Sequence, residues 1–446
     1  MEGGGIIHIS NISDFIVPSQ ECILSLRKSG PSESNVAIHK KPERDEKSSK
    51  KPRSLDNKVT VSLNDCLACS GCITSAETVL IQEQSSEVFL SSVGKYTLSV
   101  VTIAPQSIAS IAAKRRIDSC EAASLLFSFF DSLGVTYVID AGFARYLTLS
   151  LSFEEFLESA LPKPIFTSSC PGFVCYAEKT QGKLLTPHIS RVRSPQAIMG
   201  SLVKDYLSRS LDISPEKIYH VSVMPCYDKK LEASRSDFSK SGIRQVDCVL
   251  STAEVNAMLD GYEKHGNSKA NGPFDWLHSL SRGLVIGSGH GSTSGGYAEY
   301  IVGRFQERLS GKISVSRSKT VKNLEIIEVF EDDCLRLTAV KCYGFRNIQN
   351  LVQKMRRGKC AFDYVEIMAC PSGCVNGGGQ VRGETRQVRD ELLRRTEDVY
   401  GELRPVEELE RELYRVVDEW KSLNMDWRES LFTSYHIIDT DSDLRW

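Results

Sequence analysis

The stretch from Cys370 to Gln380, which reads CPSGCVNGGGQ, is the feature that most constrains this chain. It follows the apolar run from Tyr364 to Ala369, which predicts a buried strand. Two thiols so close in sequence can hold one soft metal centre, and consecutive glycines let the backbone approach that centre closely. We therefore expect the rest of the chain to bring further cysteines to this turn.

The number of cysteines points the same way. The sequence contains 14 cysteines, and its first residues, Met1 to Ile7, lack the basic region and long apolar stretch of a signal peptide. Nothing indicates secretion, so disulfides are not expected. Eight of the 14 cysteines fall in recognisable motifs and the others stand alone. This clustering favours metal ligands over scattered buried thiols.

Length and charge exclude several classes of protein. A chain of 446 residues is long enough for two or three domains with sizeable cores. Its net charge of −2 provides no global basic field, so we expect no nucleic-acid partner. No apolar run approaches the ~18 residues that a membrane-spanning helix needs, so we expect no membrane segment.

The first cysteine constellation has CxxCxxC spacing and comprises Cys66, Cys69 and Cys72. This spacing is typical of thiolates that wrap a [4Fe–4S] cluster, whereas zinc sites more often use two distant CxxC pairs. The position where bacterial ferredoxins carry a fourth cysteine is Ala76 here. Cys22 is the only cysteine upstream and Cys120 is the next downstream, and we favour Cys22 as the fourth ligand because a polar loop over 30–58 can fold it back.

The second constellation is dispersed along the chain and comprises Cys170, Cys226, Cys370 and Cys374. Each cysteine lies just beyond the carboxyl end of an apolar run that predicts a strand. In open α/β sheets, ligand sites gather beyond the carboxyl ends of strands, so these thiols are expected to converge. Four thiols are the number that a [4Fe–4S] cluster needs. Lys229 and Lys230 are expected beside this site, as a balancing charge or as exposed salt-bridging residues.

Strands and helical stretches alternate from Tyr96 onward, which predicts parallel α/β sheets. Predicted strands include 98–104, 135–139, 164–167, 218–224, 246–250, 324–330, 335–340 and 364–369. Apolar residues at three- and four-residue spacings predict an amphipathic helix over 406–423. The predicted division is an N-terminal cysteine module over 1–95, α/β lobes over 96–260 and 284–385, and a helical tail over 386–446.

Five motifs occur in the order of one known family: Leu63–Cys72, Thr167–Phe173, Met224–Lys230, Thr293–Gly296 and Cys370–Gln380. From about Val59 to its C-terminus, the chain resembles the iron-only hydrogenase fold in its eukaryotic hydrogenase-like branch. That branch comprises the nuclear prelamin A recognition factor-like proteins of cytosolic iron–sulfur assembly. The resemblance implies two α/β lobes with a cluster between them, preceded by a small ferredoxin-like cysteine module and followed by a helical tail.

The resemblance also implies two [4Fe–4S] clusters, one on Cys22, Cys66, Cys69 and Cys72 and a deeper one on Cys170, Cys226, Cys370 and Cys374. In true hydrogenases one deep ligand, matched here by Cys374, bridges to a catalytic di-iron unit that a lysine, matched by Lys229, contacts. The cysteine that transfers protons in those enzymes is replaced by Ser169, and their tryptophan after Cys-Pro-Gly by Phe173. A serine hydroxyl is far less acidic than a thiol, so hydrogen turnover is not expected.

The implied function is that of a carrier or adaptor in cytosolic iron–sulfur protein assembly, acting in the cytoplasm and also in the nucleus. It would link upstream scaffold NTPases to a targeting complex. The acidic C-terminus ends in Leu444-Arg445-Trp446, similar to the terminal tripeptides that dock onto the WD40-repeat subunit of that complex, although Arg445 replaces the usual acidic residue. A hydrogenase-like redox enzyme and a lamin-tail-binding protein remain the alternatives.

Overall fold

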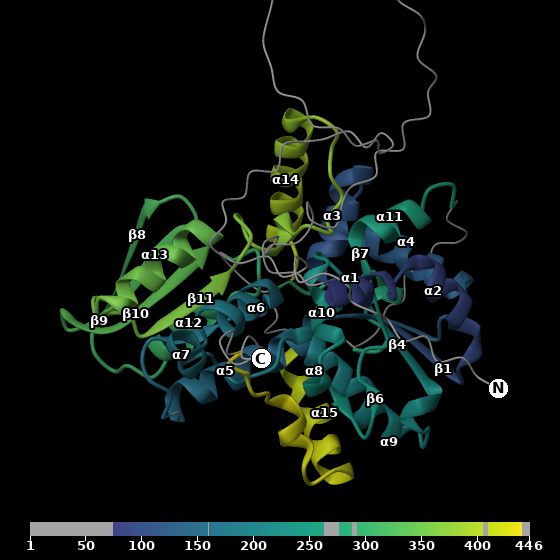
Figure 1. Cartoon of the computed structure of the whole chain (residues 1–446), viewed down its shortest axis with the longest axis horizontal. Helices are drawn as coiled ribbons and strands as arrows, with labels where there is room; N and C mark the ends of the chain where they lie inside the picture. Colours follow the sequence, from purple (N-terminus) through teal and green to yellow (C-terminus); the bar gives the residue numbers. More distant parts are fainter. Residues whose placement is uncertain (1–74, 159, 263–275, 288–291, 405–408, 439–446) are drawn as a thin grey trace, which may run out of the picture.

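The computed structural model describes residues 75–158, 160–262, 276–287, 292–404 and 409–438. Within these ranges the chain forms two main β-sheets with helices packed around them (Figure 1). The predictions for Cys22, Cys66, Cys69, Cys72 and Trp446 lie outside the described residues.

The first sheet has the order β2-β1-β4-β7, and all neighbouring strands are parallel. Its strands are β1 (Leu98–Ile103), β2 (Tyr137–Asp140), β4 (Ile218–Met224) and β7 (Cys248–Ser251). Every residue of β1 and β4 is buried, as expected for parallel strands covered by helices on both faces. The predicted strands at these positions are confirmed.

The second sheet has the order β3-β11-β10-β9-β8. Its strands are β3 (Ile165–Thr167), β8 (Ile313–Val321), β9 (Leu324–Glu331), β10 (Cys334–Tyr343) and β11 (Tyr364–Met368). Strands β3, β11 and β10 are parallel, whereas β9 and β8 continue as an antiparallel meander. The chain thus enters the second sheet with β3 before it completes the first sheet with β4 and β7.

The helices cover both sheets and lie between them (Figure 1). They are α1 (Ser75–Gln82), α2 (Ser86–Ser92), α3 (Pro105–Arg115), α4 (Ser119–Ser132), α5 (Gly142–Glu158), α6 (Pro171–Thr180), α7 (Gly182–Leu185), α8 (Pro195–Ser201), α9 (Ser208–Ser210), α10 (Asp228–Ala233), α11 (Thr252–Met258), α12 (Tyr297–Gln306), α13 (Phe345–Arg356), α14 (Arg386–Gly401) and α15 (Glu410–Leu423). The sequence Ser251-Thr252-Ala253-Glu254 predicts a capped helix after β7. This prediction is confirmed, because Ser251 and Glu254 form a reciprocal capping box at the start of α11.

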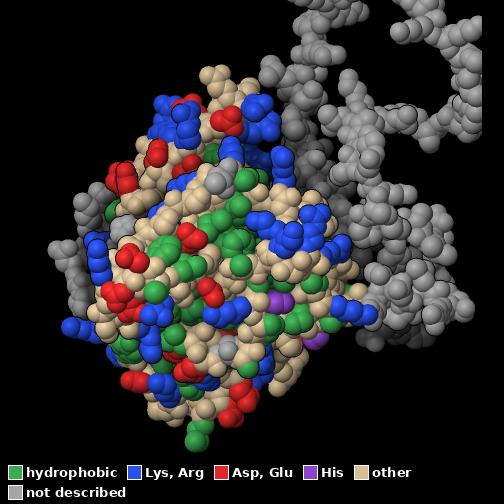
Figure 2. Space-filling view, turned by 90° about the vertical axis from the view of Figure 1, so that its left-hand side faces the viewer, with side chains coloured by type: hydrophobic (Ala, Val, Ile, Leu, Met, Phe, Trp, Pro, Cys, Tyr) green, Lys and Arg blue, Asp and Glu red, His purple; other side chains and the backbone are tan. Residues whose placement is uncertain are grey.

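The largest apolar core joins the two sheets. It contains Val100 from the first sheet, Val365 from the second, and Trp420 from α15. Helix α15 packs against α5, and α14 packs against α3. The two C-terminal helices therefore contact the rest of the fold at different places. Among the described helices, none is long and apolar enough to span a bilayer. Acidic and basic side chains are interspersed on the face drawn in Figure 2.

Candidate metal centre

The four cysteines of the second constellation line one cavity. Cys170 precedes α6, and Cys374 begins a short helical turn. Cys226 and Cys370 each lie two positions beyond the last residue of a strand, β4 and β11 respectively. Proline follows both Cys170 and Cys370, and Pro171 is the first residue of α6, a position that suits the fixed backbone angle of proline. The sequence-based prediction that these thiols converge agrees with this placement, whereas their role as cluster ligands stays a prediction.

The turn from Cys370 to Cys374 is held in an unusual backbone conformation. Ser372 and Gly373 both have positive φ, at 59° and 76°. A Cβ atom on Gly373 would lie 2.1 Å from the hydroxyl oxygen of Ser294, so only glycine fits this position. The same hydroxyl accepts a 2.8 Å hydrogen bond from the backbone N–H of Cys374. The loop before α12 therefore fixes the position of Cys374.

The glycines that follow Cys374 bring this turn against the end of β4. A Cβ atom on Gly377 would lie 2.2 Å from the carbonyl oxygen of Pro225, and one on Gly379 would lie 3.1 Å from Cα of Cys226. The N–H of Gly379 donates to that carbonyl at 2.9 Å. The glycine run thus lets the second sheet's turn contact the first sheet's strand end, which places Cys226 opposite Cys374.

Burial dominates the protonation of three of these thiols. It raises the pKa of Cys170 to about 12 and raises the pKa values of Cys226 and Cys370 well above the ordinary range. The negative charge of Asp228, which also lines the cavity, adds to the increase at all three. The free thiols are therefore neutral near pH 7, and binding a metal group there requires the loss of protons.

The fourth thiol has different neighbours. Burial raises the pKa of Cys374 as well, but the Ser294 hydroxyl and the positive charges of Lys229 and Arg145 act in the opposite direction. Both cationic side chains line the cavity. Two cations thus act on Cys374 against burial and the Glu366 carboxylate, whereas the Asp228 carboxylate acts on the other three thiols.

Four thiols are a donor set of the kind that iron–sulfur clusters use. Among the described residues, no three or more His, Cys, Asp or Glu side chains are arranged to hold one metal ion. The thiols instead surround a space. The backbone N–H groups of Ala369 and Phe173 point at the Cys170 sulfur and favour its thiolate form, as expected for a cluster ligand.

The remaining described cysteines lie apart from this cavity. Cys175, on α6, lines a neighbouring pocket instead. The others are Cys120, Cys248, Cys334, Cys342 and Cys360, and none of them lines either cavity.

The two lysines after Cys226 have different surroundings. Lys229 lines the cavity and forms a 2.7 Å ion pair with Glu232. Lys230 does not line it, which corrects the expectation that both lysines would lie there. Its ammonium group is buried and donates to the backbone carbonyl of Gln84 and to the carboxylate of Glu254. It therefore links the segment that follows α1 to α11. An exposed salt-bridging role is wrong for both lysines, because each is at least nine-tenths buried.

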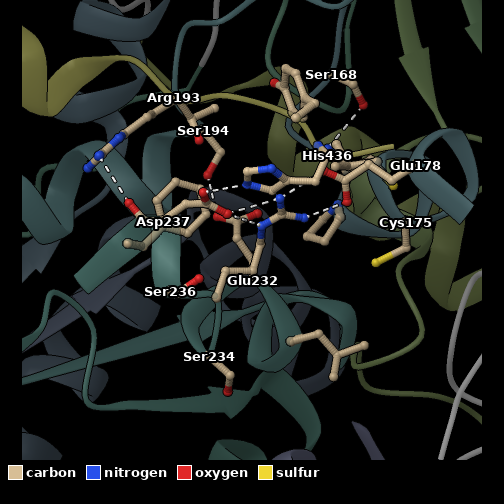
Figure 3. A pocket seen from close by; sticks show the side chains of 18 of the residues that line it. Ser168, Cys175, Glu178, Arg193, Ser194, Glu232, Ser234, Ser236, Asp237 and His436 are labelled. Atoms are coloured by element: carbon tan, nitrogen blue, oxygen red, sulfur yellow. Dashed lines mark hydrogen bonds and ion pairs between the residues drawn. The ribbon is translucent and has the colours of Figure 1, made fainter. Parts of the chain in front are cut away.

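The neighbouring pocket shares Ser169, Cys170 and Pro171 with the cysteine cavity. Figure 3 shows the charged side chains that meet in it. Arg235 donates to both carboxylate oxygens of Glu178 at 2.8 Å, and the same carboxylate accepts from the backbone N–H of His436. Residues 433–438, which follow the C-terminal helices, therefore lie across a pocket next to Cys170.

The sequence reasoning missed Arg145. It is a single charged residue in the first half of α5, where every neighbour from Gly142 to Leu149 is buried. The signal in the sequence that could have identified Arg145 is its position as the one charged residue in a stretch of apolar and small residues.

Residues 97–378 match the family model for the iron only hydrogenase large subunit, C-terminal domain. Two solved [FeFe]-hydrogenase structures from Chlamydomonas reinhardtii superpose with TM-scores of 0.63 and 0.64. They are 24% identical in sequence, and each alignment covers 79% of this chain and 98% of the hydrogenase. The chain therefore has the α/β architecture of iron-only hydrogenases.

Nearly full-length relatives narrow this class. A probable cytosolic Fe–S cluster assembly factor of Brugia malayi is 53% identical over 98% of this chain and 97% of its own length. A probable cytosolic Fe–S cluster assembly factor of Caenorhabditis elegans is 45% identical over 99% of this chain and 98% of its own length. The cytosolic iron-sulfur assembly component 3 of Mus musculus is 40% identical over 99% of this chain and 99% of its own length. This chain belongs to the family of cytosolic Fe–S cluster assembly factors.

Proposed function

We propose that this protein is an iron–sulfur carrier or adaptor that works in the cytosol, and also in the nucleus, between the scaffold NTPases that build clusters and the complex that delivers them. The observation that carries the proposal is the convergence of four thiols on one cavity. It occurs in a chain whose full-length relatives are named as assembly factors.

The deeper cluster is assigned to Cys170, Cys226, Cys370 and Cys374. Cys226 follows the first sheet, whereas Cys370 and Cys374 follow the second. A group bound to all four would cross-link the sheets, so its binding free energy would stabilise the fold that it completes. When bound, a [4Fe–4S] cluster would supply one-electron redox chemistry, while the protein residues hold it and exclude water.

A second [4Fe–4S] cluster is assigned to Cys22, Cys66, Cys69 and Cys72, in a ferredoxin-like module over 1–95. Helix α1 begins three residues after Cys72. Its Glu77 forms a 2.7 Å ion pair with Lys179 of α6, and both residues line the pocket beside Cys170. This module would therefore join the body next to the deeper site, where a cluster can be exchanged or reduced. In this proposal 96–260 and 284–385 are the two lobes and 386–446 the tail.

The proposal excludes hydrogen turnover. Ser169, at the position of the proton-transferring cysteine of hydrogenases, lines the cavity and lies with its hydroxyl 3.8 Å from the Met368 sulfur. A buried hydroxyl with a thioether partner is a poor proton donor and acceptor near pH 7. Purified, reconstituted protein should therefore evolve no hydrogen from a strong reductant, and steady hydrogen evolution would favour the enzymatic alternative.

The partner at the C-terminus is proposed to be the WD40-repeat subunit of the targeting complex, which would bind Leu444-Arg445-Trp446. A terminal aromatic next to a free carboxylate suits a pocket on such a partner. Deleting Trp446 should abolish recovery of that subunit in a pull-down, and Arg445→Glu should strengthen it. Unchanged recovery after the deletion would remove this part of the proposal.

Complementation tests the function as a whole. Cells depleted of the endogenous protein should recover activity of a cytosolic [4Fe–4S] enzyme with the wild-type chain but not with Cys370→Ser/Cys374→Ser. The matched control is Cys342→Ser, because Cys342 is buried in β10 away from the cavity. Equal rescue by both variants would contradict the proposed role of the site.

A further inference from the structure

Arg145 places a buried positive charge in the wall of the cysteine cavity. Its side chain is 5% exposed, and it lines the cavity together with Cys374. One terminal nitrogen donates to the Tyr400 hydroxyl at 2.5 Å, and the other donates to the Gln106 side-chain oxygen at 3.1 Å. Its Nε atom is buried and has no hydrogen-bond partner in the described part of the chain.

Among the described residues, no carboxylate forms an ion pair with Arg145, unlike the other cation of the cavity. Lys229 is neutralised by Glu232, whereas both side-chain partners of Arg145 are uncharged groups. The guanidinium acts electrostatically on Asp140, but burial raises the pKa of that carboxyl to about 7, and its two oxygens accept the backbone N–H groups of Gly142 and Ile286. A buried cation that no described carboxylate pairs with directly is costly, so a further negative charge nearby would stabilise it.

The thiolate end of the cavity can supply that negative charge. Four thiolates outweigh the positive charge of an iron–sulfur core, so a thiolate-ligated [4Fe–4S] cluster is an anion and becomes more negative on reduction. The charge of Arg145 acts on Cys374, and among the described groups Asp228 acts on the other thiols. Arg145 therefore acts on Cys374 together with Lys229, while the buried Glu366 carboxylate acts on the same thiol in the opposite direction.

We propose that Arg145 is a built-in counter-ion for the deeper cluster. Through its charge it raises the reduction potential of that cluster, and in the cluster-free protein the same unpaired charge destabilises the fold. Arg145 is a positioning and electrostatic residue, not a ligand. The inference rests on the proposed ligand set, and it adds a residue that distinguishes the loaded protein from the empty one.

The surrounding elements hold the guanidinium in place. Tyr400 lies near the end of α14, and Gln106 lies in the first turn of α3, against which α14 packs. The backbone carbonyl of Gln106 in turn accepts from the side chain of Gln380, at the end of the glycine turn. These hydrogen bonds hold the Arg145 guanidinium at a fixed position relative to Cys374. A fixed position is needed if its charge is to have a constant effect on the reduction potential of a bound cluster.

The first test is a redox titration of the full-length protein, reconstituted anaerobically and followed by EPR. Arg145→Met removes the charge, Arg145→Lys keeps it, and the exposed Arg304→Met is the matched control. We expect Arg145→Met to shift one of the two cluster signals to a more negative midpoint potential, with the other signal as internal standard. Arg145→Lys and Arg304→Met should leave both midpoints near those of the wild type.

The second test uses the cluster-free protein, for which the opposite sign is expected. Arg145→Met should melt at a higher temperature than the wild type when both lack iron, because the unpaired charge is gone. If Arg145→Met cannot be loaded while Arg145→Lys can, the need for a charge is supported and this second comparison decides.

Three results would overturn the inference: an unchanged midpoint in Arg145→Met, an equal shift in Arg145→Lys, or lower melting of the cluster-free Arg145→Met variant. These outcomes differ from failure of the proposed function, which would appear as a wild-type protein that binds no iron or does not rescue depleted cells.

Discussion

The backbone N–H of Cys374 donates a 2.8 Å hydrogen bond to the Ser294 hydroxyl, although the two residues are 80 positions apart in the sequence. Ser294 lies in the loop before α12 and Cys374 lies after β11. This bond fixes the fourth thiol of the cavity from outside its own turn. The arrangement of the four thiols therefore depends on Ser294, a residue that is not one of the proposed ligands.

Replacing Ser294 by alanine should lower the stability of the protein around the four-thiol cavity. The partly buried N–H of Cys374 would lose its acceptor, which costs roughly 1–3 kcal/mol for a buried group. Denaturant unfolding of the cluster-free protein should show this loss, and the reconstituted protein should release iron faster to a chelator. Ser422→Ala, on an exposed face of α15, is the control and should change neither quantity. Equal behaviour of the two variants would mean that this bond does not support the site.

Gly377→Ala should be more damaging than an ordinary glycine substitution. The new Cβ would lie 2.2 Å from the backbone oxygen of Pro225, so the glycine turn and the end of β4 must separate. Overpacking of this kind typically costs about 1–3 kcal/mol. Gly303→Ala is the matched control, because nothing lies within 4 Å of its Cβ position on α12, and helical alanine is preferred over glycine. A smaller loss for Gly377→Ala than for Gly303→Ala in melting experiments would refute the close-approach argument.

His220 should make the protein less stable in mild acid. It is fully buried in β4, where burial lowers its pKa from 6.5 to about 3. Its Nδ1–H donates to the Gln245 carbonyl, and its Nε2 accepts from the Thr102 hydroxyl, so the folded protein holds the neutral ring. Below pH 6.5 the unfolded chain binds a proton that the folded chain does not, so stability falls as pH falls.

The size of this effect follows from the linkage between protonation and folding. Between pH 6.5 and pH 5 the loss should be about 2 kcal/mol. His220→Gln should be less stable at neutral pH, because its hydrogen bonds change, but it should lose less stability than the wild type over this range. Denaturant titrations at both pH values, compared in the cluster-free state, measure the difference. An identical pH dependence in both proteins would show that another group titrates.

Glu178→Ala should release the segment over 433–438. The carboxylate accepts from the N–H of His436 and pairs with both terminal nitrogens of Arg235. Hydrogen bonds to a charged group contribute about 1.5–3 kcal/mol, so the His436 amide should exchange roughly 10- to 100-fold faster. Glu307→Ala, at an exposed ion pair just beyond the C-terminal end of α12, is the control. Unchanged exchange at His436 in Glu178→Ala would show that other contacts hold this segment.

The sequence predicted the strands that matter for the site because their signals are local. Apolar runs before Cys226 and Cys370 end in proline-containing turns, and both became strand ends with thiols just beyond them. The rule that ligand sites lie at the carboxyl ends of parallel strands then placed the thiols together. The capping box after β7 was likewise visible in four consecutive residues.

Pairings and charges between distant residues could not be predicted in this way. The three residues of β3 carry no signal that they pair with β11, nearly 200 positions away. Lys230 was expected at the site from its neighbour Cys226, but the helical turn of α10 carries its side chain toward Gln84. Tertiary packing alone brings Arg145 to the site and the segment over 433–438 to the neighbouring pocket, and composition and periodicity do not encode such packing.

The most direct test of the account is the iron and acid-labile sulfide content of the full-length protein after anaerobic reconstitution, with EPR. The wild type should contain about eight irons and eight sulfides per chain, and Cys226→Ser/Cys370→Ser should retain about four of each. The control Cys342→Ser should match the wild type, since Cys342 lies outside the cavity. Full iron content in the double variant, or stoichiometric zinc in place of iron, would contradict the assignment of these cysteines.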